Sequence, residues 1–463
     1  MWNIRKTDRS SVPSDEHKSL PLVEQRLVDP GEAGAFAQRD AKTELKVELH
    51  QRLLDLINLS ALDQMSHEQI EAEVGDIVSE ELAKQNHALN QSERKQLVAD
   101  VLDELLGLGP LEPLLKDPTI ADILVNGHNQ VFVERFGILE PTPVRFKDEK
   151  HLLRIIQKIV SAVGRRIDES SPMVDARLAD GSRVNAVVPP LAIDGCVLSI
   201  RKFARVPIGM ERLVELASIT PSMGQVLEAI VASRRNVLIS GGTGSGKTTL
   251  LNAMSAFIDD RERIVTIEDS AELQLQQRHV VRLETRPANT EGKGEVAQRD
   301  LVRNALRMRP DRIILGEVRA GEAFDMLQAM NTGHDGSMTT VHANTPRDAL
   351  TRVEQMIGMS GIDIPARYAR SQISSAIQVV IQVSRMNDGR RKVVSISEIT
   401  GMEGEVVTMQ EIYHFRLAGL SADGQVQGRF QATGIRPRFL DQVAAHGLSL
   451  PADLFRPDAQ QET

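Results

Sequence analysis

The sequence predicts an α/β protein in which a parallel-sheet domain follows a smaller α+β domain and a helical module. Short apolar strands alternate with helical segments from residue 236 to about residue 385, which is typical of a parallel sheet with crossover helices. Upstream, brief strand patterns are joined by hairpin signals. Earlier still, apolar residues recur at helical spacing.

The composition restricts the functions that the chain can have. Its 463 residues are enough for two or three folding units. Aromatic residues make up only 3% of the chain and the formal net charge is -9. Platforms for stacking bases are therefore scarce, and no overall basic surface attracts nucleic acid. We expect no nucleic-acid partner.

Cysteine content and hydropathy indicate the compartment. The single cysteine, Cys196, excludes an internal disulfide and a multi-cysteine zinc site, which fits a reducing cytosol. No stretch approaches the roughly 18 uninterrupted apolar residues of a membrane-spanning helix. We expect a cytoplasmic protein that is soluble or peripheral to a membrane.

Local composition divides the chain into five segments. The first is polar and contains Pro13, Pro21 and Pro30, which favours a flexible tail. Apolar residues then recur at helical spacing around residues 45–57 and 97–106, which predicts helices packing on each other. The expected segments are a tail at 1–42, a helical module at 43–108, an α+β domain at 109–206, a linker at 207–221 and a parallel-sheet domain with a C-terminal extension at 222–463.

The α+β domain is predicted from the strand and turn signals that follow Gly109-Pro110. A turn at Asn126-Gly127 joins two short strands, a helix follows, and a Pro189-Pro190 loop separates two further strand patterns. The expected elements are strands at 123–125 and 131–134, a helix at 150–163, and strands at 177–188 and 197–203.

The parallel-sheet domain is predicted to begin with a helix at 222–233 that leads into a strand at 236–239. Two later strands are expected at 263–267 and 311–315, and each is followed by acidic residues. A hairpin turning at Asp388-Gly389 and a tail of poor periodicity close the chain.

A glycine-rich segment, GGTGSGKTT, lies between an apolar strand and a helix. Its glycines let the backbone turn so that successive N–H groups and the helix N-terminus face a phosphate. Lys247 can reach the β- and γ-phosphates, and the Thr248 hydroxyl can reach Mg²⁺. A flexible turn is the alternative, but both flanks match a phosphate loop. We expect ATP and Mg²⁺ to bind here, with contacts from Gly241, Gly242, Thr243, Gly244, Ser245, Gly246, Lys247, Thr248 and Thr249.

Acidic residues follow two of the predicted strands, Glu268-Asp269 after one and Glu317 after the other. Ligands of open α/β sheets bind at the carboxyl ends of strands, so both clusters should face the phosphate loop. Hydrolysis needs a carboxylate that positions or deprotonates water, and oxygen ligands for Mg²⁺. We favour Glu317 as the base and Glu268 as metal or water support, although the roles could be exchanged. The candidate metal ligands are Thr248, Glu268 and Glu317, and solvated loop carboxylates are the alternative.

Two histidines flank a further short strand in the segment GHDGSMTTVHAN. His342 follows the strand, where an imidazole could hydrogen-bond the γ-phosphate and respond to its loss. A structural hydrogen bond explains His334 equally well. His342 is therefore the candidate site residue.

Four blocks in order resemble the Walker A, Asp, Walker B and His boxes of the ATPases of type II secretion, type IV pilus and type IV secretion systems. They are GGTGSGKTT at Gly241, TIEDSAEL at Thr266, LRMRPDRIILGEVR at Leu306 and TGHDGSMTTVHANTP at Thr332. Three upstream blocks resemble the N-terminal domain of one branch, the CpaF/TadA-type ATPases of tight-adherence (Flp) pili. They are LGPLEPLL at Leu108, ILVNG at Ile123 and DARLADGSRVNAVVPP at Asp175.

The resemblance implies a RecA-like motor domain in a homohexameric ring, with ATP held between the N-terminal and motor domains. It also implies work on inner-membrane pilus platform proteins at the cytoplasmic face of that membrane, driving pilus assembly and leaving room for retraction. Arginines complete the site in this family, and four of them match family positions here. Which of them act across a subunit boundary stays open, and solvated surface ion pairs are the alternative. The four are Arg177, Arg183, Arg201 and Arg319.

The sequence differs from the pattern of related ATPases in two ways. A single cysteine disfavours the branches that carry a four-cysteine zinc site. The strand ending in Gly316-Glu317 lacks the aspartate that commonly holds Mg²⁺ in other phosphate-loop enzymes, so direct and water-mediated binding both stay open.

Two other functions compete with pilus assembly. An ATPase that energises a type IV secretion channel would look the same over the four boxes. A DNA translocase is less favoured because the chain is acidic and poor in aromatic residues.

Overall fold

The computed structural model describes residues 67–84, 90–203, 207–286, 288, 293–421, 423–457 and 461–462. The tail predicted at 1–42 and the helix predicted around 45–57 lie outside these residues. The chain divides into two compact units, Met1–Gly107 and Leu108–Thr463. Within the described residues, no helix combines the length and the apolar character that crossing a bilayer requires.

The first unit contains two helices that pack against each other, α3 (His67–Lys84) and α4 (Gln91–Leu105). Every fourth residue of α3, from Ile70 through Val74 and Val78 to Leu82, is buried in this contact. The predicted helix around residues 97–106 is confirmed by α4. Helix α3 is an element that the sequence interpretation did not include.

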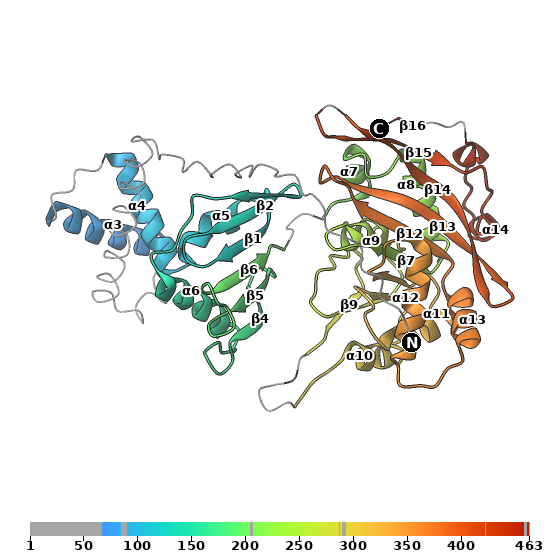
Figure 1. The fold of residues 1–463 in the computed structure, drawn as a ribbon, viewed down its shortest axis with the longest axis horizontal. Coiled ribbons are helices and arrows are strands. Elements are labelled where there is room, and N and C mark those ends of the chain that lie inside the picture. The colour runs from blue at the N-terminus through green and yellow to red at the C-terminus, as the bar shows by residue number, and fades with distance from the viewer. Residues whose placement is uncertain are drawn as a thin grey trace, which may run out of the picture. The chain divides into compact units, whose positions relative to one another are not determined.

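The second unit begins with a six-stranded antiparallel sheet in the order β3-β2-β1-β6-β5-β4 (Figure 1). Helix α6 packs on it through a stripe at helical spacing that includes Leu152, Ile155, Ile156 and Ile159. The elements are α5 (Glu112–Lys116), β1 (Ile120–Asn126), β2 (Val131–Arg135), β3 (Ile138–Pro141), α6 (Glu149–Ala162), β4 (Met173–Arg177), β5 (Arg183–Val187) and β6 (Val197–Arg201), with a 3-10 turn at Gly109–Leu111.

The single strand predicted at 177–188 is wrong, because the chain turns back within it. Strand β4 ends at Arg177 and β5 begins at Arg183, and the two pair antiparallel. Between them, Gly181 has φ of +94° and the Asp180 side chain accepts a hydrogen bond from the backbone N–H of Ser182. The Asp180-Gly181 pair was a turn signal in the sequence.

The C-terminal part of this unit is built on a ten-stranded sheet in the order β16-β15-β14-β13-β12-β7-β11-β10-β8-β9. Strands β12, β7, β11, β10, β8 and β9 pair parallel, which confirms the predicted α/β fold. The parallel strands are β7 (Val237–Gly241), β8 (Ile264–Glu268), β9 (Val280–Glu284), β10 (Arg312–Leu315), β11 (Met338–Val341) and β12 (Val379–Arg385).

Helices cover both faces of this sheet. Along β7, Val237 and Ile239 belong to one hydrophobic core with helices α8 and α9, whereas Leu238 belongs to a second core. Helices α10 to α13 pack in the second core, and Figure 1 shows α11, α12 and α13 together beside the sheet. The helices are α7 (Met210–Glu215), α8 (Pro221–Ala232), α9 (Lys247–Ser255), α10 (Gln298–Ala305), α11 (Glu322–Asn331), α12 (Pro346–Gly358) and α13 (Ala366–Ala376).

The predicted hairpin at Asp388-Gly389 is confirmed, but the stretch expected to be a poorly periodic tail forms long antiparallel strands (Figure 1). Bulges near Ser397 and Gly401 shift the register between β13 and β14, so the alternation of apolar and polar residues is broken in the sequence. The elements are β13 (Arg391–Glu403), β14 (Val406–Leu420), β15 (Val426–Ala432), α14 (Leu440–Ala445) and β16 (Gln461–Glu462), with a 3-10 turn at Ala452–Phe455.

Candidate active site

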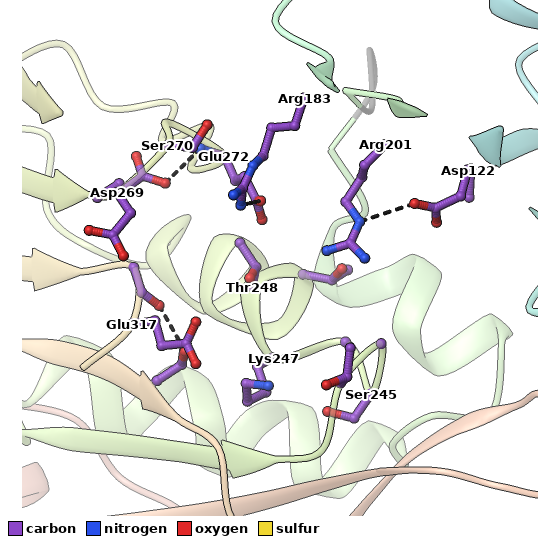
Figure 2. Close-up of a pocket in the computed structure, with 18 of the residues that line it drawn as sticks. Asp122, Arg183, Arg201, Ser245, Lys247, Thr248, Asp269, Ser270, Glu272 and Glu317 are labelled. Carbon is purple, nitrogen blue, oxygen red and sulfur yellow. Dashed lines mark hydrogen bonds and ion pairs between the residues drawn. The ribbon is translucent and has the colours of Figure 1, made fainter. Parts of the chain in front are cut away.

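An open cleft of about 1960 Å³ contains the glycine-rich loop and the acidic strand ends. One wall is formed by residues Thr243–Thr249 together with the ends of β8 and β10, and the other includes residues of the antiparallel sheet. Figure 2 shows Arg183 and Arg201 extending toward Thr248 and the loop that carries Lys247.

The loop between β7 and α9 has the backbone shape that its glycines allow. Gly244 and Gly246 have φ of +67° and +98°, which side-chain-bearing residues rarely adopt. A Cβ atom at Gly241 would collide with the carbonyl of Val383 on the neighbouring strand. The turn delivers the chain into α9 at Lys247, so the helix N-terminus faces the cleft.

Lys247 is the first residue of α9, and its side chain turns back toward the phosphate loop that precedes it. Its ammonium donates hydrogen bonds to the carbonyls of Gly241 and Gly242, both at 3.0 Å. Burial lowers the pKa of Lys247 from its ordinary value, because desolvation penalises the charged form. Thr248 and Thr249 also line the cleft.

Glu268 is the last residue of β8 and is 3% exposed. Its Oε2 accepts hydrogen bonds from the backbone N–H groups of Glu272, at 2.6 Å, and Leu273, at 2.8 Å. Its Oε1 is buried and has no hydrogen-bond partner among the described residues. Burial raises the pKa of Glu268 to about 7, even though the two backbone N–H groups oppose this shift.

Glu317 follows β10 and is held by two cationic or ionisable groups. Its Oε2 lies 2.8 Å from Nη2 of Arg319, and its Oε1 lies 2.9 Å from Nε2 of His342. Arg319 also contacts Asp269, with 2.9 Å between Nη1 and Oδ2. Arg319 therefore bridges the acidic residues that follow β8 and β10, and both groups line the cleft with the phosphate loop.

The two histidines of the fourth block have different surroundings. Nε2 of His342 lies 3.4 Å from Nζ of Lys247 as well as beside Glu317. Burial lowers the pKa of His342, and the charge of Lys247 lowers it further. By contrast, Nδ1 of His334 lies 3.3 Å from the carbonyl of Ala329, a contact local to the end of α11.

Three of the four candidate arginines come from the antiparallel sheet, and each contacts a carboxylate. Arg183 contacts Glu272 at 3.1 Å, across the cleft, whereas Arg201 contacts Asp122 of its own sheet at 3.1 Å. Arg177 contacts Glu284 at 2.9 Å. It also donates to the carbonyls of Gly181 and Ala271, which ties its guanidinium down on three sides.

The structure adds residues that the sequence patterns did not single out. Arg385 and Arg391, which flank the turn of the β12–β13 hairpin, line the cleft beside Gly244 and Gly246. Glu134 of β2 contacts both of these arginines. No local motif marks these three residues, because the contacts join distant parts of the chain. Glu272 was within a recognised block, four residues after Glu268, but its position there gave no indication that it would meet Arg183.

The carboxylate and hydroxyl oxygens of the cleft suit Mg²⁺, a cation that keeps water and phosphate oxygens among its ligands. In the part of the chain that the structure describes, no three His, Cys, Asp or Glu side chains converge as a metal cage. Mg²⁺ usually takes one or two carboxylates and completes its octahedron with water and substrate phosphates. The Oε1 atom of Glu268, which has no hydrogen-bond partner among the described residues, is an oxygen ligand of the right kind, and Glu268 lines the same cleft as Thr248.

A glycine-rich phosphate loop at the carboxyl end of a parallel strand, flanked by carboxylates and a lysine, defines an ATPase of the phosphate-loop class. The model of the family described as "Type II/IV secretion system protein" matches residues 104–428. The chain belongs to this family.

The names of several similar proteins refer to conjugal transfer or to type IV secretion. A "Putative conjugal transfer protein" of Mycobacterium tuberculosis is 42% identical over 309 residues, which are 65% of this chain and 87% of the relative. The type IV secretion system protein VirB11 of Bartonella quintana is 31% identical over 347 residues, 66% of this chain and 96% of the relative. One similar solved structure is that of the VirB11 ATPase of the Brucella suis type IV secretion system in complex with sulphate. Its sequence is 30% identical to this chain, the TM-score is 0.34, and the match covers 62% of this chain and 95% of that chain.

Proposed function

We propose that the protein hydrolyses Mg·ATP in this cleft and uses the energy to drive a type IV secretion machine embedded in a membrane. The observation that carries the proposal is the convergence of Lys247, Glu317 and His342 on one wall with Arg183 and Arg201 facing them. The conjugal-transfer and VirB11 names of the relatives favour a secretion channel as the machine.

The phosphate loop binds the nucleotide in this proposal. Residues Gly241–Thr249 surround the phosphates with backbone N–H groups, as expected for a loop of this shape. Lys247 leaves the carbonyls of Gly241 and Gly242 and turns its ammonium to the β- and γ-phosphates. Because its charge is partly desolvated, the gain in Coulomb energy on meeting phosphate is large.

Mg²⁺ would be held by Thr248 and by carboxylate oxygens of Glu268 and Glu317, directly or through water. When bound, it would neutralise charge on the phosphates. Glu268 is assigned this role because its Oε2 is already held by the backbone N–H groups of Glu272 and Leu273, while its buried Oε1 has no hydrogen-bond partner among the described residues. Burial raises the pKa of Glu268 to about 7. A nearby cation would favour its ionised form.

Glu317 acts as the general base or water-positioning group. Its carboxylate lies in the cleft after β10, between Arg319 and His342, and this position supports a role in orienting water or accepting its proton. His342 contacts both Glu317 and Lys247, and these contacts support a role for it in responding to the γ-phosphate. Arg183 and Arg201 stabilise the charge that develops on the transferred phosphoryl group, with Arg177 as an anchor of the antiparallel sheet.

We propose further that the working form is a homohexamer at the cytoplasmic face of the inner membrane. The support is the ring that the resemblance to secretion ATPases implies, together with the division of the candidate site between two walls of the cleft. In a ring, arginines can be supplied by a neighbouring subunit, which makes turnover cooperative.

A second candidate machine is the tight-adherence pilus, worked through inner-membrane platform proteins. The specific observation is the set of upstream blocks at Leu108, Ile123 and Asp175, which resemble CpaF/TadA-type ATPases. Pilin and platform genes beside this gene would favour the pilus, and relaxase and coupling-protein genes the channel. Deleting the gene in its host and measuring both conjugal transfer and surface pili would decide between them.

The central test uses Lys247→Ala. Removing this cation should lower ATP turnover by at least about 100-fold, because it removes charge aimed at the phosphates. Phosphate release by the purified hexamer measures the effect, and circular dichroism checks that the variant is folded. Turnover equal to that of the unmodified protein would overturn the proposed site.

A further inference from the structure

The β12–β13 hairpin brings two arginines to the outer side of the phosphate loop. Arg385 ends β12, Arg391 begins β13, and the two are directly opposite in the antiparallel pair. Like charges at opposing positions destabilise a hairpin unless something compensates them. The compensation comes from Glu134 of the other sheet, whose carboxylate lies 3.5 Å from Arg391 and 3.9 Å from Arg385.

Arg391 also contacts the loop backbone. Its Nε–H donates to the carbonyl of Gly244 at 2.9 Å. Gly244 lies in the middle of the loop with φ of +67°, and the side chain of Arg391 passes close to Gly246 as well. Holding this carbonyl fixes the peptide plane between Gly244 and Ser245, and the N–H of Ser245 points the opposite way across that trans peptide, where it can meet phosphate.

The contact between the hairpin and the antiparallel sheet is close at a second point. A Cβ atom at Gly137, in the turn between β2 and β3, would lie 3.1 Å from the carbonyl of Gly389 at the hairpin tip. Arg385 donates to the carbonyl of Gly137. Glu134 is 15% exposed, so its ion pairs are screened less than those of a surface carboxylate.

We propose that Arg391 is a positioning residue for ATP binding: it holds the phosphate loop through the carbonyl of Gly244, and Glu134 sets its position from the antiparallel sheet. This inference rests on the proposed nucleotide site. The β12–β13 hairpin then keeps the backbone of the phosphate loop in the conformation that binds phosphate. The position of the antiparallel sheet then affects nucleotide affinity through Glu134, without any contact between Glu134 and the nucleotide.

The test is a double-variant cycle on ATP affinity and on the separate values of kcat and KM. Arg391→Ala should raise the Kd of a fluorescent ATP analogue, and KM, by about tenfold, while kcat changes by less than about threefold. Arg391→Lys keeps the cation but lacks the Nε–H group, so it should recover only part of the affinity. Glu134→Gln should weaken binding in the unmodified chain and have no further effect beside Arg391→Ala.

The matched control is Arg390→Ala, which removes an arginine from the same hairpin. Its guanidinium contacts Gln425 and Asp388 instead of the loop. The same cycle with Arg391→Lys makes the result independent of the folding of the alanine variant. Two outcomes would overturn this inference and leave the proposed site intact. One is that the effects of the Arg391 and Glu134 substitutions on the Kd are additive. The other is that the Kd is unchanged in Arg391→Ala and Arg391→Lys while Lys247→Ala loses ATP binding. Normal ATP binding by Lys247→Ala would instead overturn the site itself.

Discussion

The two walls of the cleft hold their charged groups in different ways. On the phosphate-loop wall, Lys247 is 7% exposed and Glu268 is 3% exposed, and both are fixed by backbone hydrogen bonds. On the antiparallel-sheet wall, the side chains of Arg183 and Arg201 are 39% and 56% exposed, and each is held by one carboxylate. One wall is preorganised by burial, and the other carries long side chains that can exchange partners.

The two walls are therefore suited to different tasks. Glu268 keeps its geometry because moving it would leave the backbone N–H groups of Glu272 and Leu273 unpaired, whereas Lys247 leaves its two carbonyls only when a phosphate replaces them. Solvent-exposed ion pairs are worth only about 0–1 kcal/mol, so Arg183 and Arg201 can leave Glu272 and Asp122 at little cost. The first wall suits binding of phosphate, and the second suits contacts that form only when the cleft is loaded.

The largest effect on kcat is expected from removing the two exposed arginines of the antiparallel-sheet wall. Arg183→Ala combined with Arg201→Ala should lower kcat by about 10³-fold or more, because arginines facing transition-state charge contribute on this scale. Steady-state phosphate release checks the change. Arg166→Ala is the control, since its guanidinium is exposed and paired with Asp168. Unchanged turnover in the double variant would show that this wall takes no part in the chemistry.

A smaller loss is expected on the preorganised wall from Glu317→Gln, in the range of about 10²- to 10⁴-fold in kcat. The amide cannot accept a proton, although ATP should still bind. Measuring turnover together with the Kd for ATP separates the two effects. If Glu268→Gln abolishes hydrolysis and Glu317→Gln does not, the roles of these two carboxylates are reversed.

His342→Ala should narrow the preference for ATP over ADP, by about tenfold if one charge-assisted hydrogen bond to the γ-phosphate is lost. Calorimetric titration with each nucleotide measures the two affinities. His334→Ala is the matched control from the same block, because its ring contacts the Ala329 carbonyl. Equal losses of ATP and ADP affinity would contradict a γ-phosphate role, since a sensor must distinguish the two ligands.

The smallest effect concerns stability and pH. Folding raises the pKa of Glu268 from 4.5 to about 7, so this group favours the folded state below pH 4.5 and that contribution is lost as pH rises through 7. Glu268→Gln should therefore stabilise the nucleotide-free protein more at pH 8 than at pH 5, by at most about 3 kcal/mol. Thermal unfolding at both pH values tests this. An equal change in Tm at the two values would mean that folding does not raise the pKa of Glu268.

The fold class and the phosphate-loop wall were predictable from the sequence because their signals are local. Glycines that adopt positive φ lie next to the lysine they help to position, and the acids at Glu268 and Glu317 follow strands that are recognisable by their apolar runs. The end of a parallel strand is also the edge at which ligands bind, so sequence order alone located these side chains. The long strands after residue 391 were missed because bulges interrupt their alternation.

The contacts that the antiparallel-sheet wall and the β12–β13 hairpin make across the cleft could not be predicted from the sequence. Arg177 and Glu284 are 107 residues apart in the chain, and Arg391 and Gly244 are 147 apart. Arginine is common on surfaces, and nothing in its neighbours records which distant carboxylate or carbonyl it will meet. The pKa of Glu268 likewise depends on burial by distant strands and on an oxygen left without a partner. Local sequence fixes the backbone turn and the type of side chain, whereas desolvation and charge pairing arise only when remote segments pack together.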